Sequence, residues 1–374
     1  MIKEAVLRVY NFIVSRFFLF MRLLPLKNSV LLLTSYGDNI NYIIQNPKLR
    51  YYDEVIIYTE RTYNFKHYNN VTVYSHSNFN LKELYEISRA KNIILDNYFP
   101  VLGGMNTLKP YVTVIQTWHA VGAVKAFGLA DQTFNYRPKR SKDRFQRTYQ
   151  NVDYYISGSK TMSEIFKKAF NINDDKILKT SMPRLDFYND EAVIKHTNDC
   201  LRKSLNISNE AIIITYAPTY RENQFNVNDI HLDIEKMTRV LPNNYIIALR
   251  LHPTVELNNN LKNVINLSKG YSLESVLSMT DILITDYSSV GCEFSNLERP
   301  IIYYPYDIDD YKKEKGLIDK YENLTTSHIA YSTDDIIQMI KENQFSIDEI
   351  RKFKHQWNEY NHTNNTNVLV KVLK

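Results

Sequence analysis

Glycine and cysteine are scarce in this chain of 374 residues, and their scarcity excludes several kinds of binding site. None of the nine glycines forms a GxGxxG or P-loop pattern, so the usual glycine-rich loops for dinucleotides and nucleoside triphosphates are missing. The two cysteines, Cys200 and Cys292, are too few for a disulfide framework or a cysteine-rich zinc site. No other residues show metal-ligand spacing. We therefore expect neither a cofactor nor a metal ion.

A long uninterrupted apolar run is also missing. Residues 2–25 are strongly apolar, but cations divide them into stretches shorter than the ~20 residues that a membrane-spanning helix needs. On a helix, one face would carry the apolar side chains Val6, Val9, Ile13, Phe17, Phe20 and Leu24. The opposite side would carry Glu4, Arg8, Ser15 and Arg22. We predict that residues 1–27 form an amphipathic helix in the membrane interface, with cations facing anionic headgroups. The alternative is a helix packed on the protein's own core.

Positive charge is concentrated in two places. Residues 1–27 contribute +4 and residues 137–147 contribute +5 to a net charge of +5, so the rest of the chain carries −4. The second stretch can meet the phosphates of a substrate or of anionic headgroups, or it can be a solvated helix face. A nucleic-acid partner is not expected, because no aromatic stripe is interleaved with these cations.

From residue 30 onward, short β-rich runs alternate with helical patterns, which is typical of βαβ units and parallel sheets. The expected strands are 30–34, 55–58, 71–74, 93–95, 112–115 and 154–157, and then 212–216, 245–249, 264–267, 282–285 and 301–304. The expected helices include 81–89, 162–170, 232–240, 273–279 and 290–296. This pattern predicts an α/β protein with two doubly wound domains at 28–190 and 191–350, a connection within 183–205, and a helical tail at 351–374. Ligands would bind in a cleft at the carboxyl ends of the strands.

Polar residues directly after the predicted strands are the candidates for chemistry. His119 follows strand 112–115 and precedes a loop containing Gly122, which suits a general base. Arg250 and His252 close another strand and lie two residues apart, so they share a face on which a cation and an imidazole suit phosphate oxygens. A purely structural role for each of these side chains is the alternative.

The run 285–289, Thr-Asp-Tyr-Ser-Ser, is the strongest local signal. A hydrophobic strand leads into it and a helix is predicted to start near Val290, so its hydroxyls and the N–H groups of that helix start can bind an anion. Glu293, about one turn into the helix, can reach a ribose hydroxyl or merely favour the helix dipole. Arg184 and Arg221 are further phosphate candidates.

Together these segments resemble the CDP-glycerol glycerophosphotransferase family, which builds wall teichoic acid in Gram-positive bacteria. The matching segments occur in the family's order and are QTWHAVGAVKAFG (116–128), SMPRLDF (181–187), YAPTYRE (216–222), RLHP (250–253) and DILITDYSSVGCEFSNLERPIIYYPYDIDDY (281–311). The resemblance implies a GT-B fold and a peripheral position on the cytoplasmic face of the membrane. It also implies transfer of glycerol phosphate from CDP-glycerol to an undecaprenyl-pyrophosphate-linked disaccharide, with release of CMP. Other teichoic acid enzymes are candidate partners.

The resemblance further implies roles for individual residues. His119 falls on the catalytic histidine of the family's WH motif. His252 falls on the second essential histidine, in the HP motif, which would stabilise the pyrophosphate. The hydroxyls and the acid of the DYSS region would hold the donor's phosphates and nucleotide, and these residues are Thr285, Asp286, Ser288 and Ser289. Arg250 and Glu293 fit the same donor pocket.

One departure separates the chain from many polymerising members, which read WHGTPLK where this chain reads WHAVGAVK (118–125). The version here is similar to that of shorter members, among them primases, and the chain length agrees. We expect a priming enzyme. The alternatives are an enzyme that adds later glycerol phosphate units, and a GT-B glycosyltransferase with another nucleotide donor. A non-catalytic membrane scaffold would have no use for His119, His252 and 286–289 together.

Overall fold

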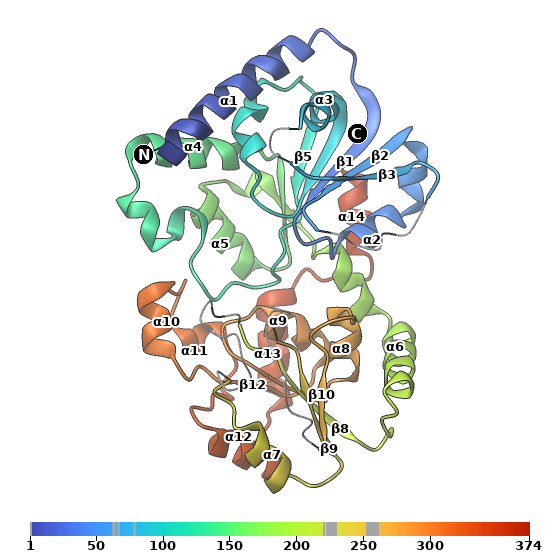
Figure 1. The fold of residues 1–374 in the computed structure, drawn as a ribbon, viewed down its shortest axis with the longest axis vertical. Coiled ribbons are helices and arrows are strands. Elements are labelled where there is room, and N and C mark those ends of the chain that lie inside the picture. The colour runs from blue at the N-terminus through green and yellow to red at the C-terminus, as the bar shows by residue number, and fades with distance from the viewer. Residues whose placement is uncertain are drawn as a thin grey trace. The chain divides into compact units, whose positions relative to one another are not determined.

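The computed structural model describes residues 2–61, 65, 68–77, 80–219, 221, 230–251 and 262–374 (Figure 1). Contacts within the chain group it into two compact units. Unit 1 comprises Met1–His119, Phe127–Asp186 and Tyr360–Lys374, and unit 2 comprises Ala120–Ala126 and Phe187–Glu359. The chain therefore enters unit 2 briefly after His119 and returns to unit 1 at its carboxyl end.

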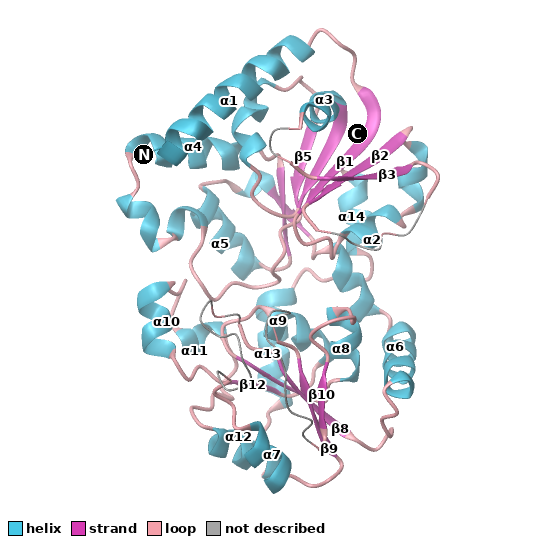
Figure 2. Ribbon diagram, in the orientation of Figure 1, coloured by secondary structure: helices cyan, strands magenta, loops and turns pink. Residues whose placement is uncertain are grey.

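Unit 1 is built on a parallel sheet whose described strands have the order β3-β2-β1-β4-β5-β6-β7. Their bounds are β1 Lys27–Thr34, β2 Glu54–Thr59, β3 Val71–Ser75, β4 Ala90–Leu95, β5 Thr113–Gln116, β6 Tyr154–Ser157 and β7 Ile177–Lys179. The central strands β1 and β4 are buried along most of their length, as in sheets that helices cover on both faces (Figure 2). The strand order reverses between β1 and β4. The loops after these two strands therefore border the point at which doubly wound sheets bind ligands.

Helices and short 3-10 helices connect the strands of unit 1. Their bounds are α1 Ile2–Met21, α2 Ile40–Ile44, α3 Leu81–Arg89, α4 Lys139–Gln150, α5 Lys160–Phe170 and α14 Asn365–Lys371, with 3-10 helices η1 Pro47–Tyr51, η2 Pro100–Thr107, η3 Gly128–Ala130, η4 Gln132–Tyr136, η5 Asp174–Lys176 and η6 Pro183–Asn189. Asn80 caps α3 and Ser159 caps α5 through their side-chain oxygens. Helix α14, red in Figure 1, lies beside α2, and its Leu369 joins the core formed with β1 and β2.

Unit 2 contains a second parallel sheet, whose described strands have the order β10-β9-β8-β11-β12. The strands are β8 Ile212–Tyr216, β9 Tyr245–Leu249, β10 Val264–Asn266, β11 Ile282–Thr285 and β12 Ile301–Tyr303. The helices are α6 Glu191–Ser204, α7 Ile234–Val240, α8 Leu273–Met279, α9 Val290–Phe294, α10 Ile308–Glu314, α11 Tyr321–Leu324, α12 Thr333–Lys341 and α13 Ile347–Asn358, with the 3-10 helix η8 Ser295–Leu297.

Side-chain alternation along the strands of unit 2 builds two cores. Ile214 and Ile284 pack with side chains of α7 and α12 on one face of the sheet, whereas Ile213 and Ala248 pack with side chains of α6 and α8 on the other. The strand order reverses between β8 and β11. The loops after these two strands therefore occupy the same place in unit 2 as the loops after β1 and β4 occupy in unit 1.

Every strand predicted from the alternation is present, and β6, β8, β9 and β11 have the predicted bounds. Strand β7 was missed because three residues at a sheet edge show no pattern. The predicted connection 183–205 is mostly helix α6, which is largely polar and buries only Leu201 and Arg202. The unit changes at Asp186 and Phe187, whereas the predicted boundary stood at residue 190. The predicted tail 351–374 is divided, since α13 belongs to unit 2 and α14 to unit 1.

Helix α1 packs on unit 1 through one side. Tyr10, Val14, Phe18 and Met21 are buried there and recur at helical spacing. The helix contacts η2 and α3. A β-carbon at Gly104 of η2 would lie 2.6 Å from Val14 Cγ1, so this glycine allows the two elements to approach closely. The alternative, a helix packed on the protein's own core, therefore describes this side.

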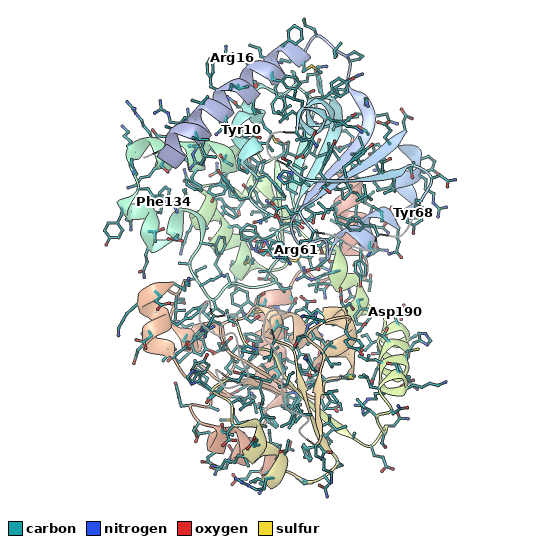
Figure 3. All side chains as sticks on the ribbon, in the orientation of Figure 1. Tyr10, Arg16, Arg61, Tyr68, Phe134 and Asp190 are labelled. Atoms are coloured by element: carbon teal, nitrogen blue, oxygen red, sulfur yellow. The ribbon has the colours of Figure 1, made fainter. Side chains whose placement is uncertain are left out.

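The other side of α1 is open and apolar. Val6, Val9, Ile13 and Phe20 have exposed fractions of 52, 59, 58 and 69%. Figure 3 shows Arg16 pointing outward from the helix. The face predicted to meet a membrane is thus the face that unit 1 leaves uncovered. None of the described helices combines the length and the apolar character needed to cross a bilayer.

Candidate active site

His119 lies just after β5, at the carboxyl edge of the sheet in unit 1. Its Nδ1 is 2.9 Å from the carbonyl oxygen of Asp96. Because a carbonyl oxygen only accepts, Nδ1 must carry the proton, and Nε2 of the neutral ring carries the lone pair. Tyr36 and Trp118 stack against the ring, with centroids 4.2 and 4.5 Å away. The ring is held in one orientation with Nε2 as its basic nitrogen, which is the arrangement of a general base.

Asp96 joins the two loops at the reversal point of this sheet. Its carboxylate accepts hydrogen bonds from the backbone N–H groups of Ser35, Tyr36 and Gly37 at 2.8, 3.1 and 3.2 Å, and from the hydroxyl of Thr34. Burial raises the pKa of Asp96, although these hydrogen bonds oppose the rise. The carboxylate thereby fixes the loop that carries Tyr36 while the carbonyl of the same residue orients His119.

Arg184 and Asn39 hold the backbone around the histidine. Trp118 has a φ of 61°, a left-handed conformation that is uncommon for a bulky residue. Its carbonyl accepts from Asn39 Nδ2 at 3.4 Å, and the His119 carbonyl accepts from Arg184 Nη2 at 3.3 Å. Arg184 is only 4% exposed. The structure therefore uses Arg184 to position the histidine, and its contact with a phosphate stays a prediction.

The segment Ala120–Ala126, which follows the histidine, is fixed in unit 2 by close packing. A β-carbon at Gly122 would lie 2.4 Å from Cys292 Sγ and 2.9 Å from Trp357 Cε3, so only glycine fits at this position. Cys292 and Trp357 are fully buried. Burial raises the pKa of the Cys292 thiol far above its usual range, which makes it an inert packing group.

Thr285 and Asp286 connect the loops after β8 and β11 in unit 2. The Thr285 hydroxyl donates to the Ala217 carbonyl at 2.7 Å. Asp286 Oδ1 accepts from the backbone N–H and the hydroxyl of Thr219, each at 2.7 Å. Both side chains are buried, and burial raises the pKa of Asp286 against the pull of Arg221. Each side chain thus has a partner within the protein, and its contact with the donor stays a prediction.

Ser288 and Ser289 stand at the start of α9 and are half-buried. The Ser288 hydroxyl oxygen accepts from the Val290 N–H at 3.3 Å. Ser289 occupies the N-cap position but makes no capping hydrogen bond with its side chain. The prediction that hydroxyls cap this helix is therefore confirmed for Ser288 alone. Binding of the donor's phosphates by either hydroxyl stays a prediction.

Arg221 is clamped between two carboxylates. Its Nε and Nη2 donate to Asp307 at 2.9 and 3.1 Å, and Nη2 also donates to Asp286 at 3.1 Å. Tyr287 and Tyr311 stack on each other with centroids 3.7 Å apart and lie beside the guanidinium. Burial alone would lower the pKa of Arg221, but the hydrogen bond to Asp307 and the charge of Asp286 raise it. In this structure the guanidinium positions the loop, and its contact with a phosphate stays a prediction.

The remaining predicted donor residues have different surroundings. Arg250 Nη1 donates to the Leu267 carbonyl beside β9. Glu293 is 1% exposed and accepts from the hydroxyl of Tyr188 at 3.1 Å. His252 lies outside the described residues. Among the residues that the structure describes, no three or more His, Cys, Asp or Glu side chains form a group that could hold a metal ion.

Comparison with known proteins identifies the family. The chain matches the family described as CDP-glycerol:poly(glycerophosphate) glycerophosphotransferase over residues 16–374. The chain belongs to this glycerophosphotransferase family. It is accordingly an enzyme, a CDP-glycerol glycerophosphotransferase, as the sequence predicted.

Two relatives of this glycerophosphotransferase are teichoic acid glycerol-phosphate primases. The one from Bacillus subtilis (strain 168) is 36% identical over 296 residues, which cover 78% of this chain and 75% of the relative. The one from Staphylococcus aureus (strain NCTC 8325 / PS 47) is 31% identical over 281 residues, which cover 75% and 72%. These matches confirm the family resemblance drawn from the sequence motifs.

A solved structure confirms the fold. The wall teichoic acid polymerase TagF matches with a TM-score of 0.81 at 23% identity, covering 100% of this chain and 95% of that one. Another matching TagF structure followed a soak with CDPG. The glycerophosphotransferase is therefore an α/β protein of the GT-B type, as predicted.

Sequence reasoning missed Tyr36, Asp96 and Asp307. Tyr36 and Asp96 come within two residues of the ends of β1 and β4. The rule that selected His119, a polar residue just after a strand, would have selected Asp96 too. Asp307 does not directly follow a strand, and its ion pair with Arg221 and its hydrogen bond from the Tyr287 hydroxyl show that it belongs to this group.

Proposed function

We propose that this glycerophosphotransferase carries out a priming step of wall teichoic acid synthesis. It transfers glycerol 3-phosphate from CDP-glycerol to a membrane lipid-pyrophosphate-linked disaccharide and releases CMP. The two primase relatives support this step, since the matches span about three quarters of each. The WHAVGAVK segment, which differs from the pattern of many polymerising members, points the same way.

The observation that carries the chemical part of the proposal is the fixed tautomer of His119. Nδ1 donates to the Asp96 carbonyl, so Nε2 takes the proton of the acceptor hydroxyl. The hydroxyl oxygen attacks the β-phosphorus of CDP-glycerol, which carries the glycerol. The bond from this phosphorus to the bridging oxygen breaks, and the bridging oxygen leaves as part of CMP. Stacking by Tyr36 and Trp118 keeps the ring aligned through the step.

Phosphoryl transfer depends mainly on positioning and on neutralising charge, which the loops of unit 2 supply in this proposal. Ser288 and Ser289 bind the donor's phosphate oxygens, because they are the half-buried hydroxyls of the 285–289 run. Arg250 and His252 stabilise the pyrophosphate. Asp286 acts mainly through the loop that it ties to Thr219.

The enzyme acts as a peripheral protein on the cytoplasmic face of the membrane in this proposal. The open apolar side of α1, which carries Val6, Val9, Ile13 and Phe20, supports this location. An amphipathic helix of this kind lies in the plane of the interface with its apolar side among the acyl chains. The acceptor is itself a membrane lipid, so such anchoring brings enzyme and acceptor together.

Mass spectrometry of the products tests the reaction. The purified enzyme is incubated with CDP-glycerol and a short-chain lipid-pyrophosphate disaccharide, and CMP is measured in parallel. The proposal predicts one added glycerol phosphate per acceptor and one CMP per addition. A ladder of products would instead make the enzyme a polymerase, and addition only to an already primed acceptor would make it a second-step transferase. Consumption of a UDP-sugar in place of CDP-glycerol would contradict the donor assignment.

A further inference from the structure

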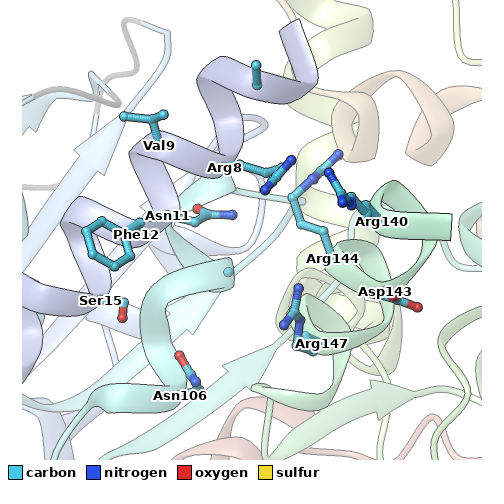
Figure 4. A pocket seen from close by; sticks show the side chains of 12 residues that line it. Arg8, Val9, Asn11, Phe12, Ser15, Asn106, Arg140, Asp143, Arg144 and Arg147 are labelled. Atoms are coloured by element: carbon cyan, nitrogen blue, oxygen red, sulfur yellow. The ribbon is translucent and has the colours of Figure 1, made fainter. Parts of the chain in front are cut away.

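A basic pocket lies between α1, η2 and α4, wholly within unit 1. Its volume is about 730 Å³. Figure 4 shows Arg8 of α1 and Arg140, Arg144 and Arg147 of α4 around one space, with Asn106 of η2 at its edge. The arginines of α4 lie four and three residues apart and therefore share one helix face. Arg8 comes from a segment more than a hundred residues away in the sequence, so the fold gathers this charge.

Among the described lining residues of this α1–α4 pocket, cations outnumber anions. Asp143 is the only acidic side chain among the described residues that line it. Within the described part of the chain, no ion pair involves Arg8, Arg140 or Arg147. Arg144 is 6% exposed and donates to the hydroxyl of Tyr98 at 2.7 Å, so it is anchored in the pocket wall. The guanidinium groups of Arg8, Arg140 and Arg147 repel one another, and an anion bound among them relieves this repulsion.

The pocket is continuous with the open apolar side of α1. Val9 and Phe12, which are 59 and 63% exposed, line the pocket as well as the helix surface. A ligand in the pocket thus meets guanidinium groups on one side and apolar side chains on the other. Phosphate attached to acyl chains has this combination of chemistry, whereas a soluble phosphate has only the first part.

A second, smaller hollow lies at the other end of α1. It has a volume of about 530 Å³ and is lined by Arg22, Leu23, Lys109 and Tyr111 among others. The ammonium group of Lys109 is buried and has no hydrogen-bond partner in the described part of the chain. Burial and the nearby charge of Arg89 lower the pKa of Lys109. The apolar side of α1 therefore runs between two cationic hollows, as expected for a surface that rests on a layer of phosphates.

We propose that the α1–α4 pocket is a binding site for the phosphate-bearing headgroup of an anionic membrane phospholipid. The guanidinium groups of Arg8, Arg140 and Arg147 bind the phosphate oxygens, and the apolar side of α1 lies among the adjoining acyl chains. The sequence left two roles open for the basic stretch 137–147, phosphate binding or a solvated helix face, and this proposal assigns different cations of the stretch to each role. Arg140 and Arg147 bind lipid, Arg144 is anchored in the pocket wall, and the other cations of the stretch form a solvated face. This site goes beyond the proposed transfer reaction and does not depend on the role of His119.

Two variants, each lacking three positive charges, distinguish a specific binding site in the pocket from a general electrostatic attraction to the membrane. The pocket variant carries Arg8→Gln, Arg140→Gln and Arg147→Gln, all at exposed positions. The control variant carries Arg137→Gln, Lys139→Gln and Lys142→Gln, which change cations of the same region that do not line the pocket. Binding of the full chain to vesicles of phosphatidylglycerol and phosphatidylcholine is measured by cosedimentation. Inorganic pyrophosphate serves as the soluble probe in thermal unfolding and as a competitor.

The proposal predicts that the pocket variant loses about a hundredfold in vesicle affinity, because each cation near an anionic surface contributes about fivefold. The control variant should lose less than about tenfold, through the screened long-range attraction alone. Equal losses of vesicle affinity in the two variants would overturn the proposal in favour of a non-specific electrostatic attraction to the membrane. Stabilisation of the parent by pyrophosphate, with vesicle binding unchanged in the pocket variant, would overturn the lipid source in favour of a soluble phosphate.

The readouts also separate this proposal from the transfer reaction. With a detergent-solubilised acceptor, the pocket variant should release CMP at the parental rate, since none of its three positions belongs to the candidate active site. Loss of vesicle binding with full CMP release supports the lipid site whatever the enzyme's product is. Unfolding of the pocket variant at a temperature well below that of the parent would show instead that the arginines hold α1 and α4 together, which would overturn the proposal.

Discussion

Replacing Asp96 with asparagine should reveal whether this carboxylate positions His119. The carboxylate accepts four hydrogen bonds, three of them on Oδ2 and the one from the Ser35 N–H on Oδ1. Asparagine keeps one oxygen, so in its best orientation an NH₂ group faces the N–H of Ser35. One buried donor is then unsatisfied, at about 1–3 kcal/mol, and the other three bonds lose the help of a full charge. Removing a charge that burial disfavours offsets part of this loss. We expect the free energy of unfolding to fall by about 2–4 kcal/mol.

Two measurements check this prediction for Asp96→Asn. The midpoint of thermal unfolding of unit 1 should fall by about 5–10 °C. At a temperature where the variant is still folded, kcat for CMP release should fall, because the backbone carbonyl of residue 96 and Tyr36 are held less firmly against the His119 ring. KM for CDP-glycerol should change little, since the donor is assigned to unit 2. Asp153→Asn is the matched control, because this exposed aspartate accepts a single backbone hydrogen bond. A variant with parental kcat would refute the positioning role, even if its stability were reduced.

Two further predictions concern stability. In Gly122→Ala the new β-carbon meets Cys292 Sγ at 2.4 Å, so the free energy of unfolding should fall by about 1–3 kcal/mol. The double variant with Cys292→Ala should lose less stability than the sum of the two single losses, because the smaller side chain leaves room for the new β-carbon. Additive losses in denaturant unfolding would contradict this contact. Burial lowers the pKa of His328 and outweighs the opposing effect of Glu349. The folded state therefore protonates His328 only at a lower pH than the unfolded chain does. The stability from neutral His328, which accepts from the Ser346 N–H, is complete above about pH 6.5 and is lost as the pH falls through the lowered pKa. His328→Gln should therefore flatten the fall of the unfolding temperature on acidification, and an unchanged slope would argue against a buried neutral histidine.

Much of the fold could be predicted from the sequence, because parallel strands buried on both faces are continuous apolar runs. Strands β8 and β11 were predicted with their bounds for this reason. Helix α6 was not, since it is largely polar and buries only Leu201 and Arg202. The return of the chain to unit 1 at its carboxyl end was also missed, because no local pattern shows that α14 packs beside α2.

The candidate site was predicted in kind but not in detail. The rule that polar residues directly after strands are candidates correctly placed His119 at the edge of the sheet. The same rule would also have selected Asp96. What a sequence cannot show is the partner of each polar group. Arg184 and Arg221 look like phosphate ligands in a motif, yet the fold directs one to the His119 carbonyl and the other to Asp286 and Asp307. These partners come from distant parts of the chain, so only the tertiary structure reveals them.

The most direct test of the central claim is the rate of CMP release by the His119→Asn variant in the presence of acceptor. Asparagine can still donate an N–H toward the Asp96 carbonyl, but it has no basic nitrogen in place of Nε2. The account predicts a loss of about 10²–10⁴ in kcat with an unchanged unfolding temperature. Release of CMP at a rate within about threefold of the parent would contradict the assignment of His119 as the base that accepts the proton of the acceptor hydroxyl.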